Sequence, residues 1–236
     1  MTTYTEKVAV VDGEFDLHVR KPASGGGPGI LLIQEIFGVG DYLHAVAEDL
    51  AGLGYVVAAP DLFWRVQPGW SVAHTEESIK QSMEVAGRFD AEQGVDDLEA
   101  ALAHLRELPE VSDGVGALGF CLGGTMAFLL AARAPLDAVV SYYGSRVPEL
   151  LDLLDEIDAP LQLQFGGSDP YIPRDQVAAV ERAVEGREGV ELHVHEKGGH
   201  AFHNRKAPMF YQAEPAAAAW PLTEAFLAEH LPVSAR

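Results

Sequence analysis

The stretch Gly119-Phe120-Cys121-Leu122-Gly123-Gly124 decides the fold, because it joins two different kinds of element without a spacer. Residues 115–118 before it form a short apolar run, which is typical of a buried strand. Residues 122–133 after it are long and apolar enough for a helix. A chain that turns this sharply needs neighbours without side chains, and the flanking glycines provide them. The sequence therefore predicts strand, turn and helix, with Cys121 at the turn.

The rest of the chain alternates between predicted strands and predicted helices. Residues 8–11 and 15–19 flank Asp12-Gly13, a pair that favours a β-hairpin. Further strands are predicted at residues 30–33, 55–59, 138–142, 161–165 and 190–195. The first helix is predicted from Asp41, as the capping residue, to about Gly54. Helical patterns follow at residues 75–108, with a break near Gly94, and at 122–133, 176–185 and 216–231. Pro221 is predicted to kink or split the last helix. This order indicates a largely parallel sheet with helices on both faces, and residues 1–236 are predicted to form a single α/β domain.

Composition narrows the partners. The 236 residues include 36 acidic and 16 basic side chains, a formal charge of −20 that repels nucleic-acid phosphates and anionic lipids. No apolar run approaches the roughly 20 residues of a membrane helix. The single cysteine and the absence of a signal-like N-terminal segment favour a cytoplasmic protein. We therefore expect a small-molecule partner, no nucleic acid and no membrane, and a monomer or a small homo-oligomer.

Cys121 has the position of a nucleophile. The spacing is that of the motif G-x-S-x-G, with cysteine in place of serine. Such a turn lifts the sulfur above the sheet edge and directs the amide of Leu122 at a reacting carbonyl oxygen. The N-terminus of the following helix favours a thiolate. Taken alone, the same pattern also fits a buried structural cysteine beside packing glycines.

Two later segments favour catalysis. Asp169 follows the strand predicted at 161–165, and His200 follows the strand predicted at 190–195. Both therefore lie at the carboxyl ends of parallel strands, where such sheets bind their ligands. The chain order of nucleophile, acid and histidine is that of α/β-hydrolases, which is the fold we predict. In this arrangement His200 takes the thiol proton and later activates water, while Asp169 fixes the imidazole tautomer.

The loop after residues 30–33 supplies two further candidates. The backbone amide of Ile36 is predicted to be the second donor of the oxyanion hole, beside Leu122. Glu35 directly follows a buried apolar run, so it is hard to interpret as a surface charge. A carboxylate near a thiol could act as a base or as a gate.

At this point the sequence resembles the dienelactone hydrolase family. The resemblance rests on six motifs in order across residues 10–230, and these are Gln34-Glu35-Ile36-Phe37-Gly38, Pro60-Asp61-Leu62, the Cys121 turn, Tyr142-Tyr143-Gly144, Gly166-Gly167-Ser168-Asp169 and Gly199-His200-Ala201-Phe202. It implies a triad of Cys121, His200 and Asp169, and a Glu35 that hydrogen-bonds the resting thiol and helps to ionise it when substrate arrives. It also implies that Tyr143 lines the pocket, and Phe37, Ala201 and Phe202 are candidate substrate contacts.

The chain departs from the family at the substrate. Members that cleave dienelactone carry an arginine and a tyrosine, four residues apart, on the helix before the turn, and here these positions align with Ile79 and Met83. The family's arginine four residues after the catalytic histidine falls on Asn204, with Arg205 next to it. Arg65, Lys80 or Arg88 could substitute. The chemistry survives these changes, but the identity of the substrate does not follow.

These observations predict a hydrolase that cleaves an ester or lactone through an acyl-thioester, without cofactor or metal. His193 and His195 share one strand face, but no other ligand-type residues complete a metal site there. Two alternatives remain: a broad carboxylesterase or thioesterase, and a non-hydrolytic binding or redox-sensing protein that uses Cys121 as a reactive thiol. Failure to turn over any activated ester would favour the last.

Overall fold

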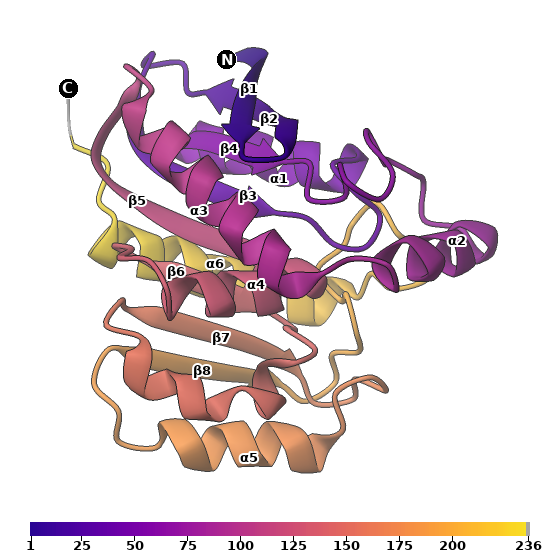
Figure 1. Ribbon diagram of the computed structural model, residues 1–236. Coiled ribbons are helices and arrows are strands. Elements are labelled where there is room, and N and C mark those ends of the chain that lie inside the picture. Colours follow the sequence, from indigo (N-terminus) through magenta and orange to yellow (C-terminus); the bar gives the residue numbers. More distant parts are fainter. Residues whose placement is uncertain (235–236) are drawn as a thin grey trace.

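A computed structural model describes residues 1–234, and its centre is one eight-stranded sheet with the order β1-β2-β4-β3-β5-β6-β7-β8 (Figure 1). β1, β2 and β4 pair antiparallel, and the remaining neighbours pair parallel. The strands are β1 (Thr2–Val10), β2 (Gly13–Lys21), β3 (Gly27–Ile33), β4 (Val56–Pro60), β5 (Val111–Phe120), β6 (Val139–Tyr142), β7 (Leu161–Gly166) and β8 (Val190–His195). This order confirms the α/β-hydrolase fold predicted from the sequence.

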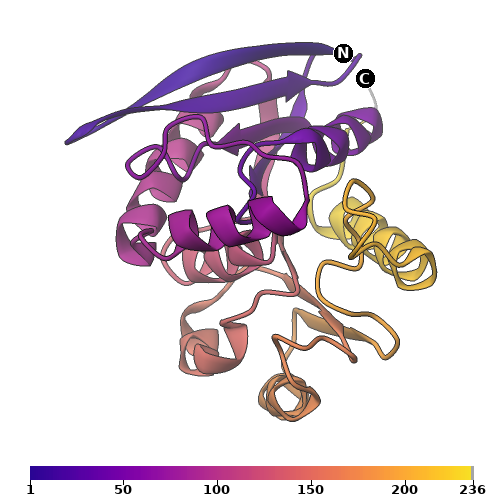
Figure 2. The same cartoon turned by 90° about the vertical axis from the view of Figure 1, so that its right-hand side faces the viewer.

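Helices cover both faces of the sheet. They are α1 (Asp41–Leu53), α2 (Glu76–Ala86), α3 (Ala91–Glu107), α4 (Leu122–Ala131), α5 (Arg174–Val184) and α6 (Ala213–His230), with short 3-10 turns at η1 (Val147–Glu149) and η2 (Leu151–Glu156). α3, α4 and α5 lie on one face and α1 and α6 on the other, while α2 projects away from the sheet (Figures 1 and 2). None of the helices in residues 1–234 combines the length and apolar character needed to cross a bilayer.

The central strands are buried on both faces, which explains their continuous apolar runs. Every residue of β3, β4, β6 and β7 is buried. Burying one aliphatic side chain stabilises the fold by roughly 1.5–3 kcal/mol. Because the central strands bury side chains on both faces, they form the most stable part of the molecule and support the loops at their ends. Because parallel strands end at the same edge, the turns after β3, β5, β7 and β8 lie near one another.

Two local predictions from the sequence are wrong, and one of the two alternatives given for Pro221 is excluded. Asp41 is the first residue of α1 and not its cap, because Gly40 takes that place without a side-chain hydrogen bond. The helical stretch 75–108 breaks between Ala86 and Ala91, where Asp90 caps α3. Gly94 lies inside α3 and does not break it. Glycine is needed at this position because a Cβ would come within 3.0 Å of the Met126 side chain. α6 runs through Pro221 without splitting.

Candidate active site

The Cys121 turn is built by contact between backbones. Cys121 caps α4 with φ 55° and ψ −114°, a conformation that L-residues rarely adopt. A Cβ on Gly119 would lie 2.9 Å from the nitrogen of Gly124, and one on Gly123 would lie 2.6 Å from the carbonyl oxygen of Gln34. The turn, the helix and the loop after β3 therefore pack at distances that only glycine permits.

The turns after β5, β7 and β8 bring three side chains into one chain of contacts. Cys121 Sγ lies 3.1 Å from His200 Nε2. His200 Nδ1 lies 2.7 Å from Asp169 Oδ2. The other oxygen of Asp169 accepts the backbone amides of Tyr171 at 2.8 Å and Ile172 at 3.3 Å. The carboxylate is thus held in place, and it fixes which imidazole nitrogen faces the sulfur.

The electrostatics of this chain favour charge separation. Burial acts to lower the pKa of His200, but the charge of Cys121, the hydrogen bonds of the imidazole with Asp169 and Cys121, and the charge of Asp169 raise this pKa to about 11. An imidazole with such a pKa holds its proton at neutral pH. The geometry therefore suits a thiolate–imidazolium pair.

Backbone strain gathers around these residues. Four non-glycine residues in positions 1–234 have positive φ, and three of them are Cys121, Tyr143 and Ala201. Ala201 follows His200 directly, and the Tyr143 ring centre lies 5.3 Å from that of His200. Strain of this kind costs on the order of 1–3 kcal/mol per residue and is concentrated at functional sites.

The two candidate oxyanion amides belong to half-buried residues and are available to bind a substrate oxygen. Within residues 1–234, neither Ile36 N–H nor Leu122 N–H donates a hydrogen bond. The loop carrying Ile36 is anchored from the segment after β4. Trp70 Nε1 donates to the carbonyl of Ile36 at 3.1 Å, and the amide of Val72 donates to the carbonyl of Phe37 at 3.2 Å. The peptide that carries the Ile36 N–H is itself held through the carbonyl of Glu35, which accepts the backbone amide of Gly38 at 3.3 Å.

Glu35 does not contact the thiol as the family resemblance implies. Its side chain is 4% exposed, and Oε2 accepts a hydrogen bond from Asn204 Nδ2 at 2.7 Å. The same Asn204 nitrogen lies 2.9 Å from His74 Nε2. Glu35 Oε1 has no hydrogen-bond partner within residues 1–234. The hydrogen-bonding partner of the sulfur is His200.

The candidate substrate contacts separate into two groups. Tyr143 is fully buried, and its hydroxyl has no hydrogen-bond partner within residues 1–234. Burial raises the pKa of this phenol well above its usual value, and the charges of Glu35 and Cys121 act in the same direction. Phe37 packs on His74, with ring centres 4.1 Å apart. Phe202 is also fully buried and packs against Tyr143, so it supports the site and does not face it; Ala201 is 4% exposed.

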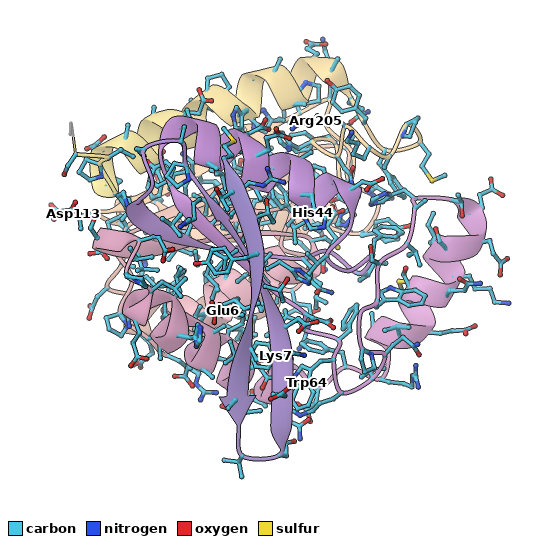
Figure 3. The ribbon with its side chains drawn as sticks, turned by 90° about the horizontal axis from the view of Figure 1, so that it is seen from above. Glu6, Lys7, His44, Trp64, Asp113 and Arg205 are labelled. Carbon is cyan, nitrogen blue, oxygen red and sulfur yellow. The ribbon has the colours of Figure 1, made fainter. Side chains whose placement is uncertain are left out.

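The structure does not bring the other candidates to the triad. Arg205 pairs with Asp49 of α1 at 2.6 Å and donates to the carbonyl of Ala45 at 3.1 Å, close to α1 (Figure 3). Ile79 is half-buried on α2, and Met83 on the same helix is 59% exposed.

Arg65 is also occupied elsewhere. It pairs with Asp12 at 2.7 Å and with buried Asp97, while Trp64 beside it stacks on Phe15 of the β1–β2 hairpin (Figure 3).

Sequence reasoning missed two residues of the site. His74 contacts Asn204, and Tyr171 lies edge-on to His200 with ring centres 5.0 Å apart. His203, in the segment between β8 and α6, is 5% exposed and stacks between Phe120 and Trp220. The position of Tyr171, two residues after Asp169, was a usable signal. No local pattern distinguishes His74.

Comparisons with known proteins identify the family of this chain. A family model described as "Dienelactone hydrolase family" matches residues 15–231. A carboxymethylenebutenolidase of Pseudomonas putida is 34% identical over 219 residues, which cover 91% of this chain and 92% of that protein. Carboxymethylenebutenolidase 1 of Cupriavidus pinatubonensis is 32% identical over 202 residues, covering 85% and 86%.

A solved structure gives the same fold. A dienelactone hydrolase-like promiscuous phosphotriesterase from metagenomic libraries superposes with a TM-score of 0.77 at 24% identity, over 99% of this chain and 100% of that one. The match to the family model and the identity to the two carboxymethylenebutenolidases extend over most of the chain. The chain therefore belongs to the dienelactone hydrolase family and is a hydrolase of that type.

Proposed function

We propose that this hydrolase cleaves an ester or lactone with Cys121 as nucleophile, His200 as acid and base, and Asp169 as the residue that orients His200. The observation that carries the proposal is the continuous chain of contacts, 3.1 Å from sulfur to Nε2 and 2.7 Å from Nδ1 to the carboxylate. Such an arrangement activates a nucleophile and fixes its base. The relatives named carboxymethylenebutenolidase support a lactone as the substrate class.

Acylation begins with attack of the thiolate on the carbonyl carbon. The negative charge that develops on the carbonyl oxygen is stabilised by the amides of Ile36 and Leu122. As the bond to the leaving oxygen breaks, His200 Nε2 gives its proton to that oxygen. The product is an acyl-thioester on Cys121 and, for a lactone, the leaving alcohol stays attached to the acyl chain.

Deacylation reverses the proton transfer. Once the sulfur is acylated, the negative charge that raised the pKa of His200 is gone, so the neutral imidazole is available as a base. It takes a proton from water as the water attacks the thioester carbon. The carbon–sulfur bond then breaks, the acid leaves, and the proton on His200 again faces a thiolate.

The proposed reaction suits a reducing compartment and a single catalytic unit. A catalytic thiolate must stay reduced, which agrees with the cytoplasmic location expected from the sequence. The eight strands form one sheet over one hydrophobic core, which supports our proposal that residues 1–236 act as one domain.

The test is hydrolysis of an activated ester by Cys121→Ala. We expect kcat/KM to fall by about a thousandfold or more, because a covalent triad acts as a unit. Mass spectrometry of wild-type enzyme quenched during turnover should find the acyl group on Cys121. The control is Ser168→Ala, which removes a hydroxyl that bonds Glu196, beside the triad but outside it, and should keep near wild-type activity.

Two outcomes would reject the proposal. Near wild-type turnover by Cys121→Ala would show that the nucleophile lies elsewhere. No turnover of any activated ester by the wild-type protein, together with ready oxidation of the thiol, would favour the redox-sensing alternative.

A further inference from the structure

A carboxylate buried beside a nucleophilic thiol has two possible kinds of partner. Glu35 is one of the few buried acids in this site, with its side chain 4% exposed. It must accept hydrogen bonds somewhere, since a buried charge without partners is costly. One choice is the thiol itself. The other is the pair of side chains found next to it, Asn204 and His74.

The orientation of the Asn204 side chain is fixed by the backbone amide of Lys206. Its Oδ1 accepts the backbone amide of Lys206 at 3.0 Å, so its Nδ2 faces Glu35 and His74. One amide hydrogen goes to Glu35 Oε2 at 2.7 Å and the other to His74 Nε2 at 2.9 Å. His74 Nε2 also lies 3.5 Å from Glu35 Oε2, so the imidazole contacts both the carboxylate and its amide donor.

His74 is itself held in place. Its side chain is 6% exposed, and its ring packs on Phe37, the residue two positions after Glu35. His74 belongs to the segment between β4 and α2, whose Val72 also hydrogen-bonds the carbonyl of Phe37. His74 is therefore in a position to keep both hydrogens of the Asn204 amide directed into the site.

We infer that His74 and Asn204 are positioning residues that hold the Glu35 carboxylate off the thiol, so that Cys121 is paired with His200 before any substrate arrives. If Glu35 turned toward the sulfur, it would accept a hydrogen bond from the protonated thiol and repel the thiolate, and both effects disfavour ionisation of Cys121. With Glu35 bound to Asn204, the sulfur pairs with His200 at 3.1 Å. The role of this arrangement in turnover rests on the function proposed above, but the state of the thiol does not.

The test measures Cys121 in the free enzyme. Iodoacetamide reacts with a thiolate by forming a carbon–sulfur bond and releasing iodide, and Cys121 is the single cysteine of the chain. In Asn204→Leu the carboxylate loses its amide donor, so we expect alkylation to slow by about tenfold or more, with a matching loss of thiolate ultraviolet absorbance. His74→Leu should slow alkylation less than Asn204→Leu does. His74→Gln should keep most of the wild-type rate, because the glutamine amide oxygen can accept the hydrogen bond from Asn204.

Two controls separate positioning from simple damage. Gln162→Leu removes another fully buried amide, one that bonds Glu191 and Thr223 under α6, and should leave the alkylation rate unchanged. In a Glu35→Gln background there is no carboxylate to hold, so adding Asn204→Leu should have no further effect. If Asn204→Leu does not fold, Asn204→Ala replaces it, because alanine also lacks a hydrogen-bond donor.

The inference is overturned if Cys121 is alkylated at the wild-type rate in a folded Asn204 variant. It is also overturned if Asn204→Leu slows alkylation just as much in the Glu35→Gln background as in the wild-type background. Neither result involves ester turnover, so a failure here is distinct from a failure of the proposed function.

Discussion

Single residues in this site carry protonation states that their surroundings impose. His203 shows the effect most clearly. Its Nδ1 lies 2.8 Å from the hydroxyl of Tyr42, and its ring is stacked between two aromatic rings. Burial, and then the charge of Arg205, lower its pKa from 6.5 to about 4. The folded protein therefore keeps this imidazole neutral where an unfolded chain would protonate it.

This shift predicts a loss of stability in mild acid. Between about pH 6.5 and pH 4 the unfolded chain binds the extra proton, so the free energy of unfolding falls as pH falls, by up to roughly 3 kcal/mol. We expect urea unfolding to show this slope for the wild-type protein and a shallower slope for His203→Gln, which cannot be protonated. Identical slopes for the two proteins would contradict the assignment. His200 acts in the opposite sense, because its raised pKa means that its contribution is lost only toward alkaline pH.

At the scale of elements, the glycines of α4 decide how closely the Cys121 turn approaches the oxyanion loop. A Cβ on Gly123 would lie 2.6 Å from the carbonyl oxygen of Gln34, and closer still to that of Ile33. Both oxygens belong to the backbone that leads to Ile36, so the loop must shift. We expect Gly123→Ala to lower kcat/KM by about a hundredfold, the cost of one misplaced oxyanion donor, and to lower Tm as well.

The matched control is a glycine in a helix with space around it. A Cβ on Gly52 of α1 would meet only Met1, at an ordinary 3.7 Å. We expect Gly52→Ala to raise the free energy of unfolding by about 0.5–1 kcal/mol, since alanine is the better helix former, and to leave kcat/KM unchanged. If Gly123→Ala behaved in the same way, the proposed packing between turn and loop would be wrong.

The same scale shows what the sequence could predict. The buried strands and the β1–β2 hairpin follow from local patterns, because continuous apolar runs and the Asp12-Gly13 pair are local signals. The break between α2 and α3 was misplaced because Gly94 looks like a helix breaker, whereas its actual role is to make room for Phe89 and Met126. That requirement is tertiary and leaves no local trace.

The residues of the site likewise fall into those that the sequence could predict and those that it could not. Cys121, Asp169 and His200 could be predicted because each follows a strand whose end the topology places at one edge. Asn204 and His74, which bind Glu35, are 169 and 39 residues from it in sequence, and no spacing rule connects them. The orientation of Arg205 likewise depends on Asp49 of α1.

At the scale of the whole molecule, the net charge of −20 bears on the choice of substrate. Arg205 and Arg65 are both paired with surface or buried acids, so neither offers a clamp for a substrate carboxylate. We expect the neutral methyl ester of a dienelactone carboxylate to be hydrolysed with a kcat/KM at least about tenfold above that of the free acid. Added salt should narrow the gap slightly, because it screens the long-range repulsion of the anion.

The measurement is kcat/KM for both compounds at two ionic strengths. A clear preference for the free carboxylate would contradict the prediction. It would direct attention to Lys206, which lines a cavity of about 290 Å³ together with His74 and Asp41.

The open sheet leaves two strands, β1 and β8, with one side of the backbone unpaired (Figure 1). β1 is the more exposed of the two, and it carries Glu6 and Lys7, the latter bound to Asp16 at 2.7 Å (Figure 3). Charged side chains on an edge oppose the addition of a strand from another molecule. In acidified, concentrated preparations, where carboxylates lose their charge, β1 is thus the strand through which we expect fibrous aggregation to begin.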